Sequence, residues 1–163
     1  MKLKNYLTLG FLLLIMAGCR SNGENHQENK FLKEDKMNNK INATPEEENG
    51  IRKALNAYIE AAVKGDSKIA KPVFGELATI SYSENGSMVS APIQALFDYY
   101  DQTGPHHAEY EITSLEVAGN VAIVRIDSKF GDVSFDDMFS LVKDGDNWKI
   151  VSKVYNIKEN PLL

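Results

Sequence analysis

The sequence predicts an α+β domain in which three helices, with a hairpin among them, precede one wide antiparallel sheet. Apolar residues recur at helical spacing between positions 44 and 104. Four segments rich in β-branched and aromatic residues then follow one another, separated by short turns. Because segments of about ten residues are long for the strands of a small domain, we expect the sheet to twist and curl around the helices.

Residues 1–18 have the order of a bacterial lipoprotein signal peptide. Two lysines precede an apolar run over residues 6–17, which is shorter than the ~20 residues needed to span a bilayer. The run ends in Ile15-Met16-Ala17-Gly18-Cys19, which resembles a lipobox cut before an acylated cysteine. Cys19 is the only cysteine of the chain, so no intramolecular disulfide can form. We therefore expect the mature protein to begin at Cys19 and to be held on a membrane by its lipid.

A polar segment, residues 19–43, follows the signal peptide and is rich in Asn, Lys, Glu and Gln. Such a composition cannot bury enough apolar surface to offset the entropy of ordering the chain. We expect a flexible tether, with a transient helix over Lys30–Ile41. Close after the cysteine stands Ser21, not the aspartate that favours retention in the inner membrane of Gram-negative cells. The expected location is thus the cell envelope, at the outer membrane, with the domain formed by residues 44–163.

The charge of the chain excludes some partners. The whole sequence has 18 basic and 23 acidic residues; without the two lysines of the signal peptide, 16 basic and 23 acidic residues leave a net charge of −7. No basic cluster is present to neutralise phosphates, so nucleic acid is not an expected partner. The sequence also has no metal-ligand spacing and no phosphate-binding glycine loop, so we expect neither a metal nor a cofactor. The neighbouring His106 and His107 stand in a loop, where adjacent side chains point apart.

The first helix is predicted to begin after Thr44 and to end before Gly65. Thr44 and Glu47 match a capping box, and Pro45 occupies the first helical position. Glycine at the end of the apolar periodicity is a stop signal. The residues of the apolar face are Ile51, Leu55, Tyr58, Ile59 and Ala62.

A short second helix and a hairpin follow. Asp66 can cap this helix, and Pro72 limits its length. The turn Glu84-Asn85-Gly86-Ser87 then joins two strands, residues 78–83 and 88–91.

A third helix and a meander complete the domain. Pro92 is predicted to open the helix, and Gly104-Pro105 to end it. The apolar face of this helix consists of Ile93, Leu96, Phe97 and Tyr100. The predicted strands of the meander are Glu109–Ala118, Val121–Phe130, Val133–Lys143 and Trp148–Ile157, with turns at Gly119-Asn120, Gly131-Asp132 and Asp144–Asn147.

Two stretches near the C-terminus are distinctive, Phe135–Lys143 with the following Asp144-Gly145, and Trp148–Val154. With the first helix, they resemble the nuclear transport factor two-like (cystatin-like) cone fold, and within it the lumazine-binding or SnoaL-like proteins, over Glu46–Asn156. The resemblance implies a strongly curved sheet wrapped on three helices and a conical cavity. It also implies small hydrophobic or aromatic ligands, and homodimers formed through the sheet.

Pairing the strands through their turns predicts which residues face the cavity, because alternate residues share a face. Across the turn at Gly131-Asp132, Ile126 falls beside Asp137. The pairs predicted for the last two strands are Lys143 with Trp148, Leu141 with Ile150, Phe139 with Ser152 and Asp137 with Val154. Asp137 is thus a carboxylate on an otherwise apolar face.

A carboxylate in that setting either gains hydrogen-bond partners or has its pKa raised by desolvation. In the first case Asp137 accepts hydrogen bonds from Tyr58, Tyr82 or Thr113, or lies at the solvated rim of the cavity. In the second case it can serve as a general base. The pocket residues predicted from these arguments are Tyr58, Tyr82, Thr113, Ile126, Asp137, Phe139 and Ser152.

Three functions remain open from the sequence. We favour a membrane-anchored lipoprotein that binds a small apolar or aromatic molecule without catalysis. The second is an enzyme of isomerase, cyclase or hydrolase type that uses Asp137 as general base. The third is an envelope scaffold that dimerises through its sheet.

Overall fold

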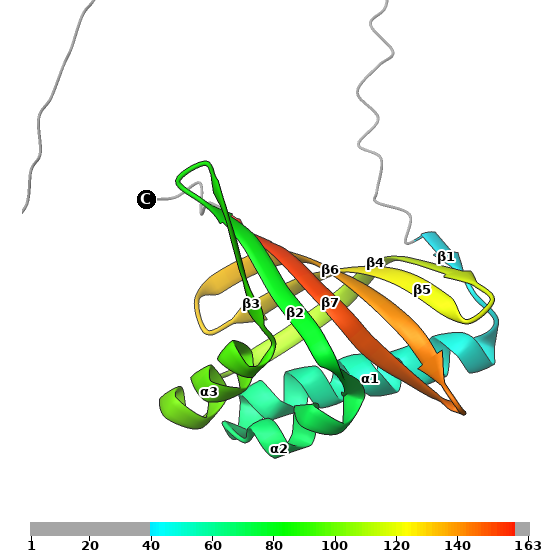
Figure 1. The fold of residues 1–163 in the computed structure, drawn as a ribbon, viewed down its shortest axis with the longest axis horizontal. Helices are drawn as coiled ribbons and strands as arrows, with labels where there is room; N and C mark the ends of the chain where they lie inside the picture. Colours follow the sequence, from blue (N-terminus) through cyan, green and yellow to red (C-terminus); the bar gives the residue numbers. More distant parts are fainter. Residues whose placement is uncertain (1–39, 159–163) are drawn as a thin grey trace, which may run out of the picture. The chain divides into compact units, whose positions relative to one another are not determined.

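The computed structural model describes residues 40–158, which form three α-helices, one short 3-10 helix and a single seven-stranded sheet. Figure 1 shows the helices gathered on one face of the curved sheet. This arrangement confirms the predicted α+β fold with a curved sheet wrapped on three helices. The signal peptide, Cys19 and most of the predicted tether lie outside the described residues.

Helix α1, Pro45–Lys64, begins and ends where the sequence predicts. The Thr44 backbone N–H donates to the Glu47 carboxylate at 2.8 Å, and the Glu47 N–H donates to the Thr44 hydroxyl at 3.3 Å, which completes the capping box. Gly65 ends the helix with a left-handed φ of 62°. A Cβ at Gly65 would lie 2.3 Å from the carbonyl carbon of Gly104, so glycine also permits the close approach of the loop after α3.

The two shorter helices are tied to one another. Helix α2, Ser67–Ala70, is capped by the Asp66 carboxylate and continues as the 3-10 helix η1, Lys71–Val73. The N–H and hydroxyl of Ser67 both donate to the Asp101 carboxylate of α3 at 2.8 Å. Helix α3 spans Gln94–Thr103, slightly later than predicted, because Pro92 still belongs to a strand.

The sheet has the order β1-β4-β5-β6-β7-β2-β3. Its neighbours pair antiparallel except for β1 with β4 and β2 with β7, which are parallel, so the sheet is mixed where the sequence suggested antiparallel pairing throughout. Hairpin turns impose antiparallel pairing only on the strands that they join directly. The position of the β2–β3 hairpin beside β7 depends instead on tertiary packing. The strands are β1 Lys40–Asn42, β2 Phe74–Glu84, β3 Ser87–Pro92, β4 Ala108–Ala118, β5 Val121–Phe130, β6 Val133–Asp144 and β7 Asn147–Ile157.

Strand β1 lies within the segment predicted as tether. Its residues Lys40–Asn42 pair with Ser114–Glu116 of β4. The sheet therefore includes residues that lie before the predicted domain boundary at Thr44.

The pairing of β6 with β7 follows the prediction only up to one β-bulge. Lys143 opposite Trp148 and Leu141 opposite Ile150 are confirmed, and so is Ile126 opposite Asp137 on β5. Beyond the register shift between Ser140 and Leu141, Phe139 lies opposite Lys153 and Asp137 opposite Tyr155; the predicted partners Ser152 and Val154 are wrong. One extra residue in β7 reverses which of its side chains face the helices.

The core lies between α1 and the concave face of the sheet. Tyr58 of α1 contacts Phe139 of β6 edge-on, with the ring centroids 5.3 Å apart. Trp148 packs so closely on α1 that a Cβ at Gly50 would lie 2.8 Å from its ring. Within residues 40–158, none of the helices is both long and apolar enough to cross a membrane.

Candidate functional site

A cavity of about 350 Å³ lies between α3, the β2–β3 hairpin and one end of the curved sheet. Its volume is within the range of ~300–1,000 Å³ typical of small-molecule sites. Its walls come from every layer of the domain: Tyr58 of α1, Ile80 and Tyr82 of β2, Val89 and Ala91 of β3, Ala95, Leu96, Tyr99 and Tyr100 of α3, His106, Phe130 of β5, Phe135 of β6, and Lys153 and Tyr155 of β7.

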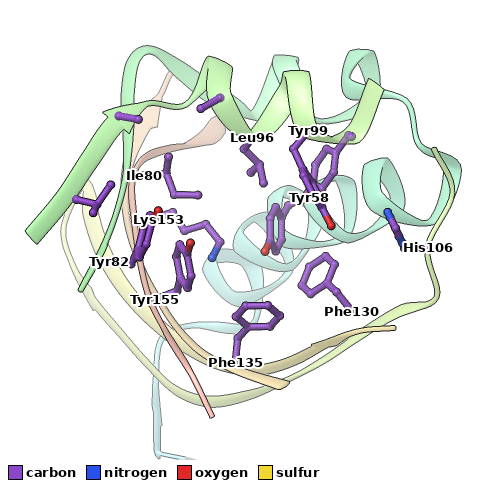
Figure 2. A pocket seen from close by; sticks show the side chains of 14 residues that line it. Tyr58, Ile80, Tyr82, Leu96, Tyr99, His106, Phe130, Phe135, Lys153 and Tyr155 are labelled. Atoms are coloured by element: carbon purple, nitrogen blue, oxygen red, sulfur yellow. The ribbon is translucent and has the colours of Figure 1, made fainter. Parts of the chain in front are cut away.

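Aromatic rings form a continuous wall on the sheet side of the cavity. Tyr82 stacks on Tyr155 with the centroids 4.9 Å apart, and Tyr155 meets Phe135 edge-on at 5.7 Å. The edge-on contacts continue from Phe135 to Phe130 at 5.7 Å and from Phe130 to Tyr58 at 5.8 Å. Figure 2 shows these rings around one hollow. Rings held by one another in this way present apolar faces and positive edges to an aromatic ligand.

A buried ion pair lies beside this wall. The Lys153 ammonium donates to one carboxylate oxygen of Asp137, and the Ser128 hydroxyl donates to the other at 2.5 Å. The three residues come from β7, β6 and β5, so adjacent strands bring them together. Only 5% of the Lys153 side chain and none of that of Asp137 is exposed. The ammonium also lies 4.2 Å from the centroid of the Tyr155 ring, a cation–π contact that supports a buried cation.

Burial sets the acid–base behaviour of the cavity groups. Desolvation lowers the pKa of Lys153, and the Asp137 carboxylate opposes this effect only in part. Desolvation raises the pKa of Tyr58 and of Tyr100. Near neutral pH the tyrosines are therefore hydrogen-bond donors, and Lys153 releases its proton more readily than an exposed lysine.

Two polar atoms on cavity-lining side chains lack a hydrogen-bond partner among the described residues. These buried atoms are the Tyr100 hydroxyl and His106 Nε2. The His106 ring stacks on Tyr99, with the ring planes only 8° apart, and the backbone N–H of His106 donates to the Ala62 carbonyl at 2.9 Å. A buried polar atom without a partner costs about 1–3 kcal/mol, so a ligand that meets either atom recovers part of that cost.

The predicted pocket residues fall in three different places. Tyr58 and Tyr82 line the cavity. Asp137, Ile126 and Phe139 are fully or almost fully buried on the same face of the sheet, but outside the cavity lining. As ligand contacts, these residues remain predictions.

Thr113 and Ser152, the other two predicted pocket residues, lie at β-bulges and outside the cavity lining. Thr113 lies at the register shift of β4, where its hydroxyl donates to the Arg125 carbonyl at 3.3 Å. Ser152 pairs with the exposed Ser140, so the predicted inward position of Ser152 is wrong. The partners expected for Asp137 are wrong as well, since Ser128 and Lys153 occupy its oxygens in place of Tyr58, Tyr82 or Thr113.

Sequence reasoning missed the cavity residue with the most distinctive chemistry, Lys153. Its position becomes inward only through the bulge in β7, so the period-two pattern assigns it to the solvent face. His106 was expected in a loop and does lie in one, yet the close approach of that loop to α1 makes it part of the cavity wall. Among residues 40–158, no cluster of three or more His, Cys, Asp or Glu side chains is placed to hold a metal ion.

Comparisons with known proteins agree with this architecture. The model of a family described as putative lumazine-binding matches residues 46–156. An aldolase, FrzH of Cladobotryum sp, is 28% identical over 116 residues, which cover 69% of this chain and 93% of the aldolase.

Two solved structures are also similar. An NTF2-like protein of unknown function from Shewanella baltica OS155 has 32% identity and a TM-score of 0.67, covering 73% of this chain and 99% of that protein. An NTF2-like protein of unknown function from Methylobacillus flagellatus KT has 28% identity and a TM-score of 0.66, covering 74% and 98%.

Proposed function

The chain belongs to the putative lumazine-binding family of NTF2-like proteins, and from this membership we propose that it binds a small aromatic molecule in its cavity while Cys19 anchors it to a membrane of the cell envelope. The proposal separates into a ligand and an anchor. Each has its own support and its own test.

The cavity itself is the observation that supports ligand binding. A scaffold that acts only through its outer surface has no need of an internal cavity, and it gains stability when side chains fill the interior, because protein cores are normally close-packed. Here about 350 Å³ is left open and is walled by aromatic rings that contact one another. Its polar groups include the Lys153 amine, the hydroxyls of the lining tyrosines and His106 Nε2. This combination suits a flat aromatic ring that carries a hydrogen-bond acceptor such as a carbonyl or phenolic oxygen.

Ligand binding is tested with the full chain carrying Cys19→Ser, which cannot be acylated and needs no detergent that could fill the cavity. Mass spectrometry of small molecules released from this protein identifies a co-purifying ligand. Calorimetric titration with lumazine, a bicyclic ring with two carbonyls, and with 4-hydroxybenzyl alcohol measures the affinity for two aromatic shapes.

Ala95→Trp places a large ring at the cavity wall from an exposed position of α3. The matched control is Gln102→Trp, an exposed position of the same helix outside the cavity lining. We expect binding to be lost in the first variant and kept in the second. Equal binding in both, or no ligand and no binding in any protein, would contradict the proposal.

Lipid anchoring rests on the lipobox sequence before Cys19. The expected result is that the chain incorporates labelled palmitate in bacterial cells and separates with membranes, and that Cys19→Ser abolishes both. Cell fractionation then distinguishes the proposed outer-membrane location from the inner membrane.

An enzymatic function remains the second candidate, and one relative favours it, since FrzH is described as an aldolase. Asp137 as the general base is the weaker form of this candidate, because its oxygens are occupied by Lys153 and Ser128 and it lies outside the cavity lining. The ionisable group that reaches the cavity from this pair is Lys153.

A further inference from the structure

We propose that Lys153 is a covalent binding site for a ligand carbonyl, and that the cavity takes small aromatic aldehydes or ketones, which its amine holds as a Schiff base. This inference rests on the proposed function, because it requires that the aromatic cavity admits a ligand. It adds a substrate class and a bond to one named atom, Lys153 Nζ.

The position of Lys153 is the first argument. Its stem rises from the inward face of β7, and its amine ends between the rings of Tyr155 and Tyr58 on the cavity wall (Figure 2). Nζ lies 4.2 Å from the Tyr155 centroid and 5.9 Å from the Tyr58 centroid. An aromatic carbonyl compound that stacks on this wall brings its carbonyl carbon to the amine with little further loss of freedom.

The isolation of Lys153 from water is the second argument. Surface lysines are strongly hydrated ammonium ions, whereas only 5% of the Lys153 side chain is exposed. Burial lowers the pKa of its amine, which increases the neutral, nucleophilic fraction near neutral pH. Exclusion of water also protects an imine from hydrolysis.

Asp137 supplies the third argument, because an ammonium must lose a proton before it can attack. The Asp137 carboxylate accepts a hydrogen bond from Nζ and is held in place by the Ser128 hydroxyl. It is therefore a positioned proton acceptor behind the nucleophile, on the side away from the cavity lining. Ser128 acts only through Asp137, as a positioning residue.

The proposed step is balanced without an external oxidant or reductant. Lys153 Nζ transfers one proton to Asp137, and its lone pair forms a bond to the carbonyl carbon while the C=O π electrons move to oxygen. Proton transfer from nitrogen to this oxygen gives a carbinolamine. Its hydroxyl then leaves as water with the proton held by Asp137. The net change converts an ammonium and a carbonyl compound into an iminium and one water, and the iminium charge again faces the Asp137 carboxylate.

The experiment captures the imine by reduction. The full chain with Cys19→Ser is incubated with 4-hydroxybenzaldehyde and sodium cyanoborohydride, a hydride donor that reduces the iminium to a stable secondary amine. Peptide mapping by mass spectrometry then locates the hydroxybenzyl group. We expect Lys153 to be labelled faster than the exposed Lys129, because burial lowers the pKa of its amine and the cavity holds the aldehyde beside it.

4-Hydroxybenzyl alcohol separates this inference from the proposed function, because it has the same ring but no carbonyl. It should slow the labelling of Lys153 and leave that of Lys129 unchanged. If the alcohol binds in the cavity but the aldehyde labels only exposed lysines, the Schiff base is refuted and the binding function stands. If neither compound binds, both proposals fail.

Substitutions of Lys153 test whether its amine is the labelled group, and a second variant is available if the first does not fold. Lys153→Arg keeps a cation opposite Asp137 but has no primary amine, so we expect the fast labelling to vanish while the alcohol still binds. Should that variant unfold by circular dichroism, the double variant Lys153→Met with Asp137→Leu removes both charges and serves the same purpose. Lys129→Met is the control and should keep the fast labelling. Undiminished fast labelling in a folded variant without Lys153 would overturn the proposal.

Discussion

Lys153 and Asp137 form an ion pair with 5% and 0% of their side chains exposed, and the Lys153 amine is also part of the cavity wall. One contact thus links the stability of the sheet to the chemistry of the candidate site. A buried charge without its partner is costly, whereas a matched pair is tolerated. The two residues can be tested as a unit.

Asp137→Asn should lower the free energy of unfolding by about 3–5 kcal/mol, because it leaves the Lys153 cation buried without a counter-charge. The double variant Asp137→Leu with Lys153→Met should be close to wild type, since no buried charge remains. Urea unfolding followed by circular dichroism measures both. The control is Glu48→Gln, which removes a partly exposed helix pair with Arg52 and should cost about 0.5 kcal/mol. Additive losses at Asp137 and Lys153 would refute the coupling.

The labelling rate of Lys153 should depend on pH differently from that of exposed lysines. Because burial lowers its pKa, the neutral amine appears with a midpoint below the usual 10.5. Between the lowered pKa of folded Lys153 and 10.5, the unfolded chain binds the proton more tightly than the folded chain does. The contribution of Lys153 to the free energy of unfolding therefore rises with pH over this range. Reductive labelling between pH 7 and 11 gives the midpoint; one at or above that of Lys129 would contradict the prediction.

The Tyr100 hydroxyl should contribute to ligand affinity and not to the stability of the free protein. It is buried and makes no hydrogen bond of normal geometry within residues 40–158, although it interacts with the neighbouring Tyr58, so Tyr100→Phe should cost the free protein less than about 1 kcal/mol and weaken the binding of 4-hydroxybenzyl alcohol. The matched control is Tyr110→Phe, which removes a hydrogen bond to Asn56 at 2.6 Å and should cost about 1 kcal/mol. Thermal unfolding and calorimetry report the two effects. A large loss of stability for Tyr100→Phe would indicate a structural hydroxyl instead.

Gly65 should tolerate alanine far less than Gly145 does, although both have φ near 60°. A Cβ at Gly65 collides with the backbone of Gly104 and Pro105, whereas nothing lies within 4 Å of one at Gly145. Gly145→Ala should therefore cost about 1 kcal/mol, the strain of a left-handed alanine, and Gly65→Ala clearly more. The second substitution should also disturb the loop that carries His106. Equal midpoints of urea unfolding for the two variants would contradict this close approach.

The outer face of the sheet is the expected dimer surface, as the family resemblance implies. Met138 is 49% exposed there and lies opposite Val154 of β7, with Ile123 of β5 also exposed. If two copies pair through this face, Met138→Glu should shift the protein to the monomer in light-scattering measurements. Met88→Glu on the β2–β3 hairpin, at a methionine that is more exposed than Met138, is the control and should leave the dimer intact. A wild-type monomer at high concentration would refute the proposed homodimer.

Local signals in the sequence determine the elements of this fold. Capping at Thr44, the stop at Gly65 and the short turns between strands act over a few residues, so they can be read without the rest of the molecule. The position of Asp137 beside Ile126 followed from one such turn, and it is confirmed. The lipobox at Cys19 is likewise a local pattern, and its acylation remains a prediction.

Tertiary structure decided what these signals cannot encode. The bulge in β7 turns Lys153 inward and Ser152 outward, and the parallel pairing of β2 with β7 brings Tyr82 against Tyr155. A bulge arises because long strands must bend to close around the helices, so its place depends on the packing of the whole sheet. The sequence alone determined that a carboxylate would be buried in this cone. The β-bulge in β7, which depends on the tertiary structure, determined that a lysine is the partner of this carboxylate and reaches the cavity.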